Sequence, residues 1–268
     1  MLGVRQTHDH ELVARNLRHA MSSYARSTEQ GEVTESPGVV MVNSGVPYSV
    51  FNAALLTESI TGNLGALTDA LNHAERHYER RKMPWSCWTC EDYFDGDLRR
   101  DARNLLSQRG LRLVAEHSGM IADSIAAPDR VLPPMEVRRV SDHATRSDFI
   151  RVASEVFYLP RGVARRVYDS DRYWEASMVG WVGYVNERPV STAATDSSAG
   201  SVGLYSVATL NGYRKRGYGE RITRHALESA RRATGFERSI LQSTRSGLAM
   251  YSRLGYRPLA RFLVYVFP

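Results

Sequence analysis

The most informative part of the sequence is the stretch Val207-Ala-Thr-Leu-Asn-Gly-Tyr-Arg-Lys-Arg-Gly-Tyr-Gly219. A strand-like run, 202–209, leads into it, and the run 220–234 that follows places its apolar residues on one helical face. Glycines allow a ligand to approach the backbone closely, and the free amides at the start of a helix attract anions. The sequence therefore predicts a strand, a glycine-rich phosphate-binding turn and a helix, with an arrangement that suits a pyrophosphate.

The segments after this turn continue the alternation of strands and helices. The sequence predicts a short strand over 239–243, a short helix over 247–254 that Gly255 ends, and a last strand over 256–267. Before the turn it predicts strands over 135–140, 176–186 and 189–195, with helices between the first two. These elements together predict an α/β fold with a mixed sheet.

Two motifs in this region resemble the signatures of the GNAT superfamily of N-acetyltransferases. Arg214-Lys-Arg-Gly-Tyr-Gly219 matches the family's Gln/Arg-x-x-Gly-x-Gly/Ala turn, and Tyr251-Ser-Arg-Leu-Gly-Tyr256 matches its Tyr-x-x-x-Gly-Phe/Tyr segment. Both occur in the family's order, and the resemblance extends over about residues 134–268. It implies the GNAT fold and acetyl-CoA, or another acyl-CoA, as cosubstrate, without a metal.

The resemblance also implies which residues hold the cosubstrate. The strand before the turn would bind the pantetheine arm, the turn would bind the pyrophosphate, and the last helix would approach the sulfur. The residues concerned are Val207, Ala208, Thr209, Arg214, Lys215, Arg216, Gly217, Tyr218, Gly219, Ser243 and Tyr251. The Val207 amide is the candidate for polarising the thioester carbonyl. Ser243 has the alternative role of capping the following helix.

Two side chains are candidate catalytic residues. Tyr251 matches the family tyrosine that acts as general acid toward the CoA thiolate, although its place on an apolar stripe is also compatible with simple packing. No carboxylate stands where the family often has a base, so Asp196 on the preceding strand is the candidate. Asp196 could instead be a solvated turn residue, and a water relay could replace it.

The function implied is transfer of an acetyl or other acyl group from acyl-CoA to a primary amine of a small molecule or peptide, by direct attack in a ternary complex. Five aromatic residues suggest an aromatic wall for the acceptor, with helix packing as the alternative: Phe157, Tyr158, Tyr168, Tyr173 and Trp174. Two other classes stay open. One is a non-catalytic acyl-CoA-binding or sensing protein, and the other is an RNA-acting acetyltransferase.

The chain of 268 residues is long enough for two domains, and three prolines within 126–134 mark an extended linker between them. The catalytic domain is predicted over 135–268. Residues 1–125 also alternate helices and strands, ending in a pair of strands over 110–123. Their layout resembles a degenerate GNAT copy, as in bacterial tandem GNAT proteins. Because this half lacks the Arg-x-x-Gly-x-Gly turn, one active cofactor site per chain is expected.

The formal net charge of +6 arises entirely near the proposed phosphate turn. Residues 212–261 hold twelve Lys or Arg against three Glu, a net +9, so the remainder of the chain carries −3. A CoA with its pyrophosphate and 3′-phosphate accounts for this excess, and no nucleic-acid partner is expected. A monomer or homodimer is compatible with the sequence.

The sequence contains no run of eighteen apolar residues and no secretory signal at its polar start, so a cytoplasmic protein without a membrane partner is expected. Cys87 and Cys90 have the spacing of a redox or metal motif. They are the two cysteines of the chain and no histidine cluster accompanies them, so a buried strand containing Trp85 and Trp88 is the favoured interpretation. His225 is expected to be a packing or surface residue.

Overall fold

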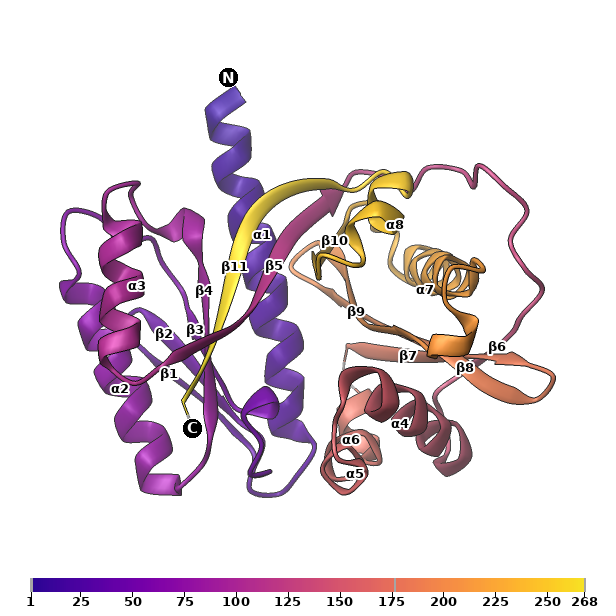
Figure 1. Ribbon diagram of the computed structural model, residues 1–268, viewed down its shortest axis with the longest axis horizontal. Helices are drawn as coiled ribbons and strands as arrows, with labels where there is room; N and C mark the ends of the chain where they lie inside the picture. The colour runs from indigo at the N-terminus through magenta and orange to yellow at the C-terminus, as the bar shows by residue number, and fades with distance from the viewer. Residues whose placement is uncertain (1, 176, 268) are drawn as a thin grey trace.

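A computed structural model describes residues 2–175 and 177–267, with side chains in the first helix from Asp9 onward. An 11-stranded mixed sheet has the order β1-β2-β3-β4-β11-β5-β10-β9-β8-β7-β6. Helices cover its faces (Figure 1), which confirms the predicted α/β architecture. Residues 1 and 268, which the predicted domains include, and residue 176, the predicted start of a strand, lie outside the described residues.

The N-terminal half consists of three α-helices, three short 3-10 helices and five strands. Its elements are α1 (Leu2–Ser22), η1 (Ser23–Arg26), β1 (Glu32–Ser36), β2 (Val39–Asn43), η2 (Ser49–Phe51), β3 (Ala53–Leu56), α2 (Gly65–Arg81), β4 (Trp85–Cys90), η3 (Glu91–Tyr93), α3 (Leu98–Gln108) and β5 (Arg112–Ala122). The predicted pair of strands over 110–123 is wrong. A single long strand, β5, replaces it because this strand pairs with neighbours in both halves.

The C-terminal half has helices on both faces of its strands. Its elements are β6 (Glu136–Arg139), α4 (His143–Phe157), α5 (Arg161–Tyr168), α6 (Asp171–Trp174), β7 (Met178–Val185), β8 (Arg188–Ser198), β9 (Ser201–Thr209), η4 (Asn211–Tyr213), α7 (Tyr218–Thr234), β10 (Ser239–Ser243), α8 (Leu248–Arg253) and β11 (Arg257–Phe267). Gly235, with φ +74°, ends α7, and its amide donates to the Arg231 carbonyl.

The two halves exchange their last strands. Residues 118–122 of β5 pair with β10 in the C-terminal half. Residues 262–267 of β11, the last strand of the chain, pair with β4 in the N-terminal half. In Figure 1, β11 and β5 run side by side through the middle of the molecule. Each half therefore completes its sheet with a strand from the other, and the domain limits drawn along the sequence stay a prediction.

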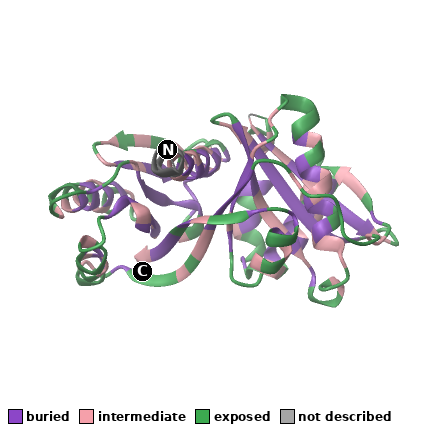
Figure 2. Ribbon diagram, turned by 90° about the horizontal axis from the view of Figure 1, so that it is seen from above, coloured by how far each residue is buried: buried purple, intermediate pink, exposed green. Residues whose placement is uncertain are grey.

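The helices divide between the two faces of the C-terminal sheet. Ala20 of α1 packs in one cluster with residues of α4–α6, and Tyr24 stacks on Tyr173 with 5.7 Å between ring centroids. Ile222 and Ala226 of α7 belong to a different cluster. Figure 2 shows the buried strands between helices whose outer sides are exposed. Helix α1 thus lies on the same face as α4–α6, and α7 covers the opposite face.

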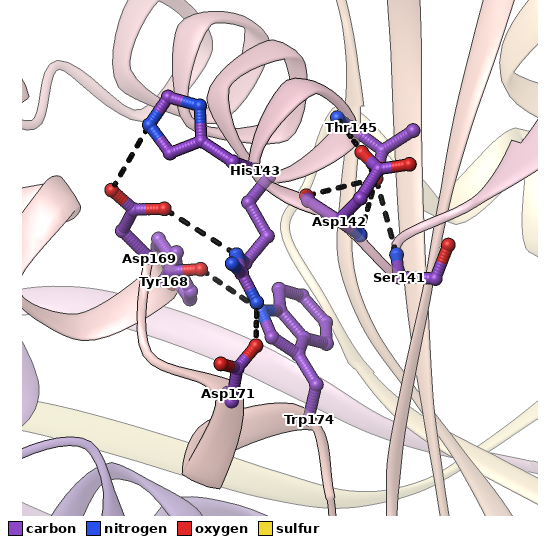
Figure 3. Close-up of polar contacts among 9 residues, drawn as sticks. Ser141, Asp142, His143, Thr145, Tyr168, Asp169, Asp171 and Trp174 are labelled. Atoms are coloured by element: carbon purple, nitrogen blue, oxygen red, sulfur yellow. Dashed lines mark hydrogen bonds and ion pairs between the residues drawn. The ribbon is translucent and has the colours of Figure 1, made fainter.

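Polar contacts fix α4, α5 and α6 to one another (Figure 3). Asp142 caps α4 by accepting from the Thr145 amide at 2.8 Å. Arg146 lies between Asp169, at 3.3 Å, and Asp171. The Trp174 indole donates to the Tyr168 carbonyl at 2.9 Å. These bonds tie the segment between α5 and α6 to the first turn of α4.

The segment between β5 and β6, residues 123–135, forms neither helix nor strand. Its role as a linker between domains stays a prediction. It follows the surface of α7. The Arg130 guanidinium lies 3.1 Å from Glu220, and the Arg224 side chain donates to the Ala126 carbonyl. Among the described helices, none has the length and apolar character needed to cross a membrane.

Candidate functional site

Strands β9 and β10 are paired at one end and diverge at the other. Their parallel pairing covers Val202–Leu204 of β9 and Ser239–Leu241 of β10. Gln242 and Ser243 of β10 continue to pair with β5 on the other side. A wedge therefore opens between the two strands after Leu204, on the side where β9 leads to the glycine-rich turn.

A β-bulge lies in β9 at the start of this wedge. Thr192 pairs with Ala208 and Ala194 with Tyr205, so that Ser206 and Val207 both stand opposite one residue of β8. Ser206 has φ +51°, and its carbonyl accepts from the Thr192 hydroxyl at 2.9 Å. A bulge removes a residue from the ladder of a sheet. Contact of the Val207 amide with a ligand carbonyl stays a prediction, and Ala208 is buried.

The glycine-rich turn has the backbone that its sequence predicts. Gly217 immediately precedes α7 with φ +95°, and Lys215 has φ +59°. A Cβ on Gly219 would lie 3.1 Å from Thr209 Oγ1, so a side chain there would be crowded. Arg214 Nε donates to the Thr209 carbonyl at 2.9 Å, which ties the turn to the end of β9.

The start of α7 is open and positively charged. Arg214, Lys215 and Arg216 are exposed, Tyr218 is half-buried, and among the described residues no side chain caps the helix. Glu220 in the first turn is buried, but Arg224 and Arg130 lie 2.9 and 3.1 Å from its carboxylate. Since these arginines neutralise Glu220, the helix terminus keeps its preference for an anion.

Tyr251 lies in α8, the helix that follows the end of β10. Its ring is buried and stands next to Gly247, where an added Cβ would be 2.9 Å from both the ring and Ser243 Oγ. Ser243 is buried, and its hydroxyl donates to the Thr244 carbonyl at 2.8 Å. Burial raises the pKa of Tyr251. The phenol is therefore protonated at neutral pH, as a proton donor must be.

Asp196 is not in a solvated turn. It lies in β8 and is fully buried, whereas the turn consists of Ala199 and Gly200. Its Oδ2 is 2.8 Å from Nδ1 of His19 in α1, and its Oδ1 makes no hydrogen bond to any described residue. His19 was not among the predicted site residues, because it is separated from Asp196 by 177 residues and no spacing rule connects them.

The structure separates the five predicted acceptor-side aromatics into two groups. Tyr168, Tyr173 and Trp174 pack together, with ring centroids 5.2 Å apart between the tyrosines and 4.7 Å apart between Tyr173 and Trp174. Phe157 and Tyr158 are exposed at the end of α4. Tyr24, from the turn after α1, and Tyr205, from β9, pack against the buried group. Packing accounts for most of these rings.

Cys87 and Cys90 are buried free thiols in β4, and burial raises the pKa of each to about 12. No group of His, Cys, Asp and Glu in the described residues has the arrangement of a metal site. His225 packs edge-on against Trp181, 4.5 Å between ring centroids, and burial lowers its pKa. These features agree with packing roles.

The corresponding place in the N-terminal half is closed. Strands β3 and β4 are parallel and paired like β9 and β10. Beyond their ends, Ile60 and Phe94 form a further parallel bridge, and the Ile60 amide donates to the Tyr93 carbonyl at 2.6 Å. The intervening loop contains Glu58 and no Lys or Arg. A second wedge for a phosphate-bearing ligand is therefore absent from this part of the described chain.

Comparisons with known proteins agree with this geometry. The family described as "Acetyltransferase (GNAT) domain" matches residues 172–258. A GCN5-related N-acetyltransferase from Kribbella flavida has 16% identity and a TM-score of 0.70, and the alignment covers 94% of this chain and 95% of that one. A GCN5-related N-acetyltransferase from Sphaerobacter thermophilus has 16% identity and a TM-score of 0.58, covering 85% and 76%.

A tandem GNAT protein from the clavulanic acid biosynthesis pathway shares the arrangement of both halves. It has 10% identity and a TM-score of 0.57, and the alignment covers 85% of this chain and 77% of that one. No curated protein matches the chain by sequence. The fold is that of two tandem GNAT-like units, and residues 172–258, which contain both sequence motifs, match the GNAT acetyltransferase domain family.

Proposed function

We propose that the C-terminal half transfers an acetyl or other acyl group from acyl-CoA to a primary amine of a small molecule or peptide. The observation that carries this proposal is the wedge between β9 and β10, which has a bulge at Val207 and leads to the turn at Gly217 and Gly219. Together they offer a slot for a pantetheine arm and a positive helix terminus for its pyrophosphate.

Each residue of the site has a separate role in the proposed reaction. The Val207 amide polarises the thioester carbonyl, the segment from Val207 to Thr209 holds the arm, and the turn from Arg214 to Gly219 holds the phosphates. Tyr251 gives its proton to the departing thiolate. Its raised pKa keeps the phenol protonated at neutral pH, so that the proton is present when the thiolate leaves. Asp196 stays the candidate carboxylate on the acceptor side.

A screen for free thiol release from acetyl-CoA, over aliphatic, aromatic, amino-sugar and peptide amines, tests the proposal. We expect transfer to at least one primary amine, with the acyl product detected by mass spectrometry. Tight binding of acetyl-CoA without transfer to any amine would contradict the proposed activity and favour an acyl-CoA-binding or sensing protein. Preferential acetylation of RNA, falling steeply with salt, would instead favour the nucleic-acid alternative.

A further inference from the structure

Helix α1 of the N-terminal half contributes a polar cluster to the face of the sheet opposite α7. Asn16 and His19 are two of its residues. The Asn16 side-chain oxygen accepts from the Tyr205 hydroxyl at 2.6 Å, and its amide group donates to the Asp196 carbonyl at 3.2 Å. A Cβ on Gly203 would collide with Asn16 Oδ1. The helix therefore lies directly on β8 and β9, immediately before the bulge.

The contact between His19 and Asp196 has the geometry of a carboxylate that orients an imidazole. Asp196 is fully buried, whereas the His19 side chain is 41% exposed. Because an ionised carboxylate only accepts hydrogen bonds, the tautomer that suits the 2.8 Å contact has its hydrogen on Nδ1 of His19. The lone pair of the neutral ring is then on Nε2, which is the nitrogen that does not contact Asp196. Ser177 Oγ lies 3.5 Å from the same Nδ1.

The neighbouring groups are poorly suited to take up a proton. Burial raises the pKa of Tyr205 and of Tyr173, with the charge of Asp196 contributing in both cases. Burial also raises the pKa of Tyr24 and Tyr168. These phenols therefore stay protonated at neutral pH. Asp196 has no access to solvent, whereas the His19 ring is partly exposed.

The cluster lies close to where the reaction is proposed to occur. Asp196 pairs with Gly203, three residues before Ser206 in the bulge. At about 3.3 Å per residue this is about 10 Å along the strand. For a proton to pass from the bulge to this cluster, the His19 ring and a bridging water must together span this distance. Gln242, the first residue of β10 beyond its pairing with β9, has a buried Nε2 that makes no hydrogen bond to any described residue.

We propose that His19 is the general base of the reaction, and that Asp196 is the positioning residue that holds its ring. This inference rests on the proposed acyl transfer. The neutral amine attacks the thioester carbonyl carbon, and the N–H proton of the adduct passes to His19 Nε2 through one water. The C–S bond breaks as the amide forms, and the thiolate takes the Tyr251 proton. His19 and Tyr251 then return to their initial states by exchange with solvent.

The test compares His19→Ala, Asp196→Asn and the double variant with the wild-type chain. The probe is acetyl-CoA with the amine that gives the fastest thiol release. General base catalysis predicts that His19→Ala lowers kcat/KM by about 100-fold or more, with the calorimetric Kd for acetyl-CoA within about twofold of wild type. Added imidazole should restore part of the activity of His19→Ala, which a purely structural role would not produce.

The double variant tests whether Asp196 acts through His19. If Asp196 acts through His19, the double variant is no slower than His19→Ala alone. His143→Asn is a matched control, because His143 lies 3.7 Å from Asp169 in a second His–Asp pair, on the exposed side of α4 (Figure 3), and should retain wild-type activity.

Two kinds of result separate this inference from the proposed function. If the wild type is active and His19→Ala has the same rate, His19 is not the general base, and the transferase proposal stands. The same holds if His19→Ala is slow and imidazole does not restore its activity. A wild type that binds acetyl-CoA but acetylates no amine contradicts both.

Discussion

Because the two halves exchange strands, we expect that removing the Phe262 side chain destabilises both halves. Phe262 of β11 pairs with Cys90 of β4 on one side and His117 of β5 on the other. Its ring is buried and rests on Gly119, where an added Cβ would lie 2.7 Å from the ring. Phe262→Ala therefore leaves a cavity next to a glycine, which has no side chain to fill it.

The expected loss follows from this geometry. Truncation of a buried phenylalanine costs about 3–5 kcal/mol, and a site that cannot collapse lies toward the upper end, about 4–5 kcal/mol. Because β11 belongs to both halves, hydrogen exchange should show this loss equally in peptides from β3 and from β8. Val33→Ala in the exposed edge strand β1 is the control, with a change within about 0.5 kcal/mol. Unchanged protection of β8 in Phe262→Ala would refute the coupling.

Three further predictions concern single side chains. Tyr251→Phe should lower kcat at least about tenfold and leave the Kd for acetyl-CoA unchanged. Equal turnover by the variant and the wild type would rule out Tyr251 as the proton donor. Burial lowers the pKa of His77 from 6.5 to about 4, so the unfolded chain binds more protons in this interval. The free energy of unfolding should therefore fall as pH drops from 6.5 to 4, and His77→Gln should flatten this dependence in urea titrations. Because burial raises the pKa of Cys87 and Cys90 to about 12, neither thiol should react with a disulfide reagent in the native protein at pH 8, and both should react in denaturant. Rapid labelling of the native chain would contradict their burial.

The sequence predicted the phosphate turn because that element is local. Gly217 and Gly219 lie within a few residues of the strand and helix that they connect, so spacing alone describes the turn. Strand β3 was not predicted, because Ala53–Leu56 is buried throughout and an apolar run without alternation does not distinguish a strand from a helix. Strand β1 has a single apolar residue, Val33, and is a half-exposed edge.

The long-range features could not be predicted from spacing or periodicity. The pairing of β11 with β4 joins residues more than 160 positions apart in the chain, such as Phe262 with Cys90. The contact of His19 with Asp196 likewise depends on how α1 lies against the other half. Such contacts follow from the packing of the two halves, which leaves no periodic or motif signal in either segment.

The proposed acyl transfer requires that the turn before α7 bind the phosphates of acyl-CoA. Calorimetric titration of acetyl-CoA into wild type, Gly217→Glu and Gly212→Glu tests it directly. Gly217 has φ +95°, and a Cβ there would lie 2.8 Å from Pro133, whereas Gly212 has open space around it and receives the same charge. We predict saturable one-to-one binding by wild type and Gly212→Glu, weakened at least about 100-fold in Gly217→Glu. No binding by wild type, or equal binding by all three, would contradict the account.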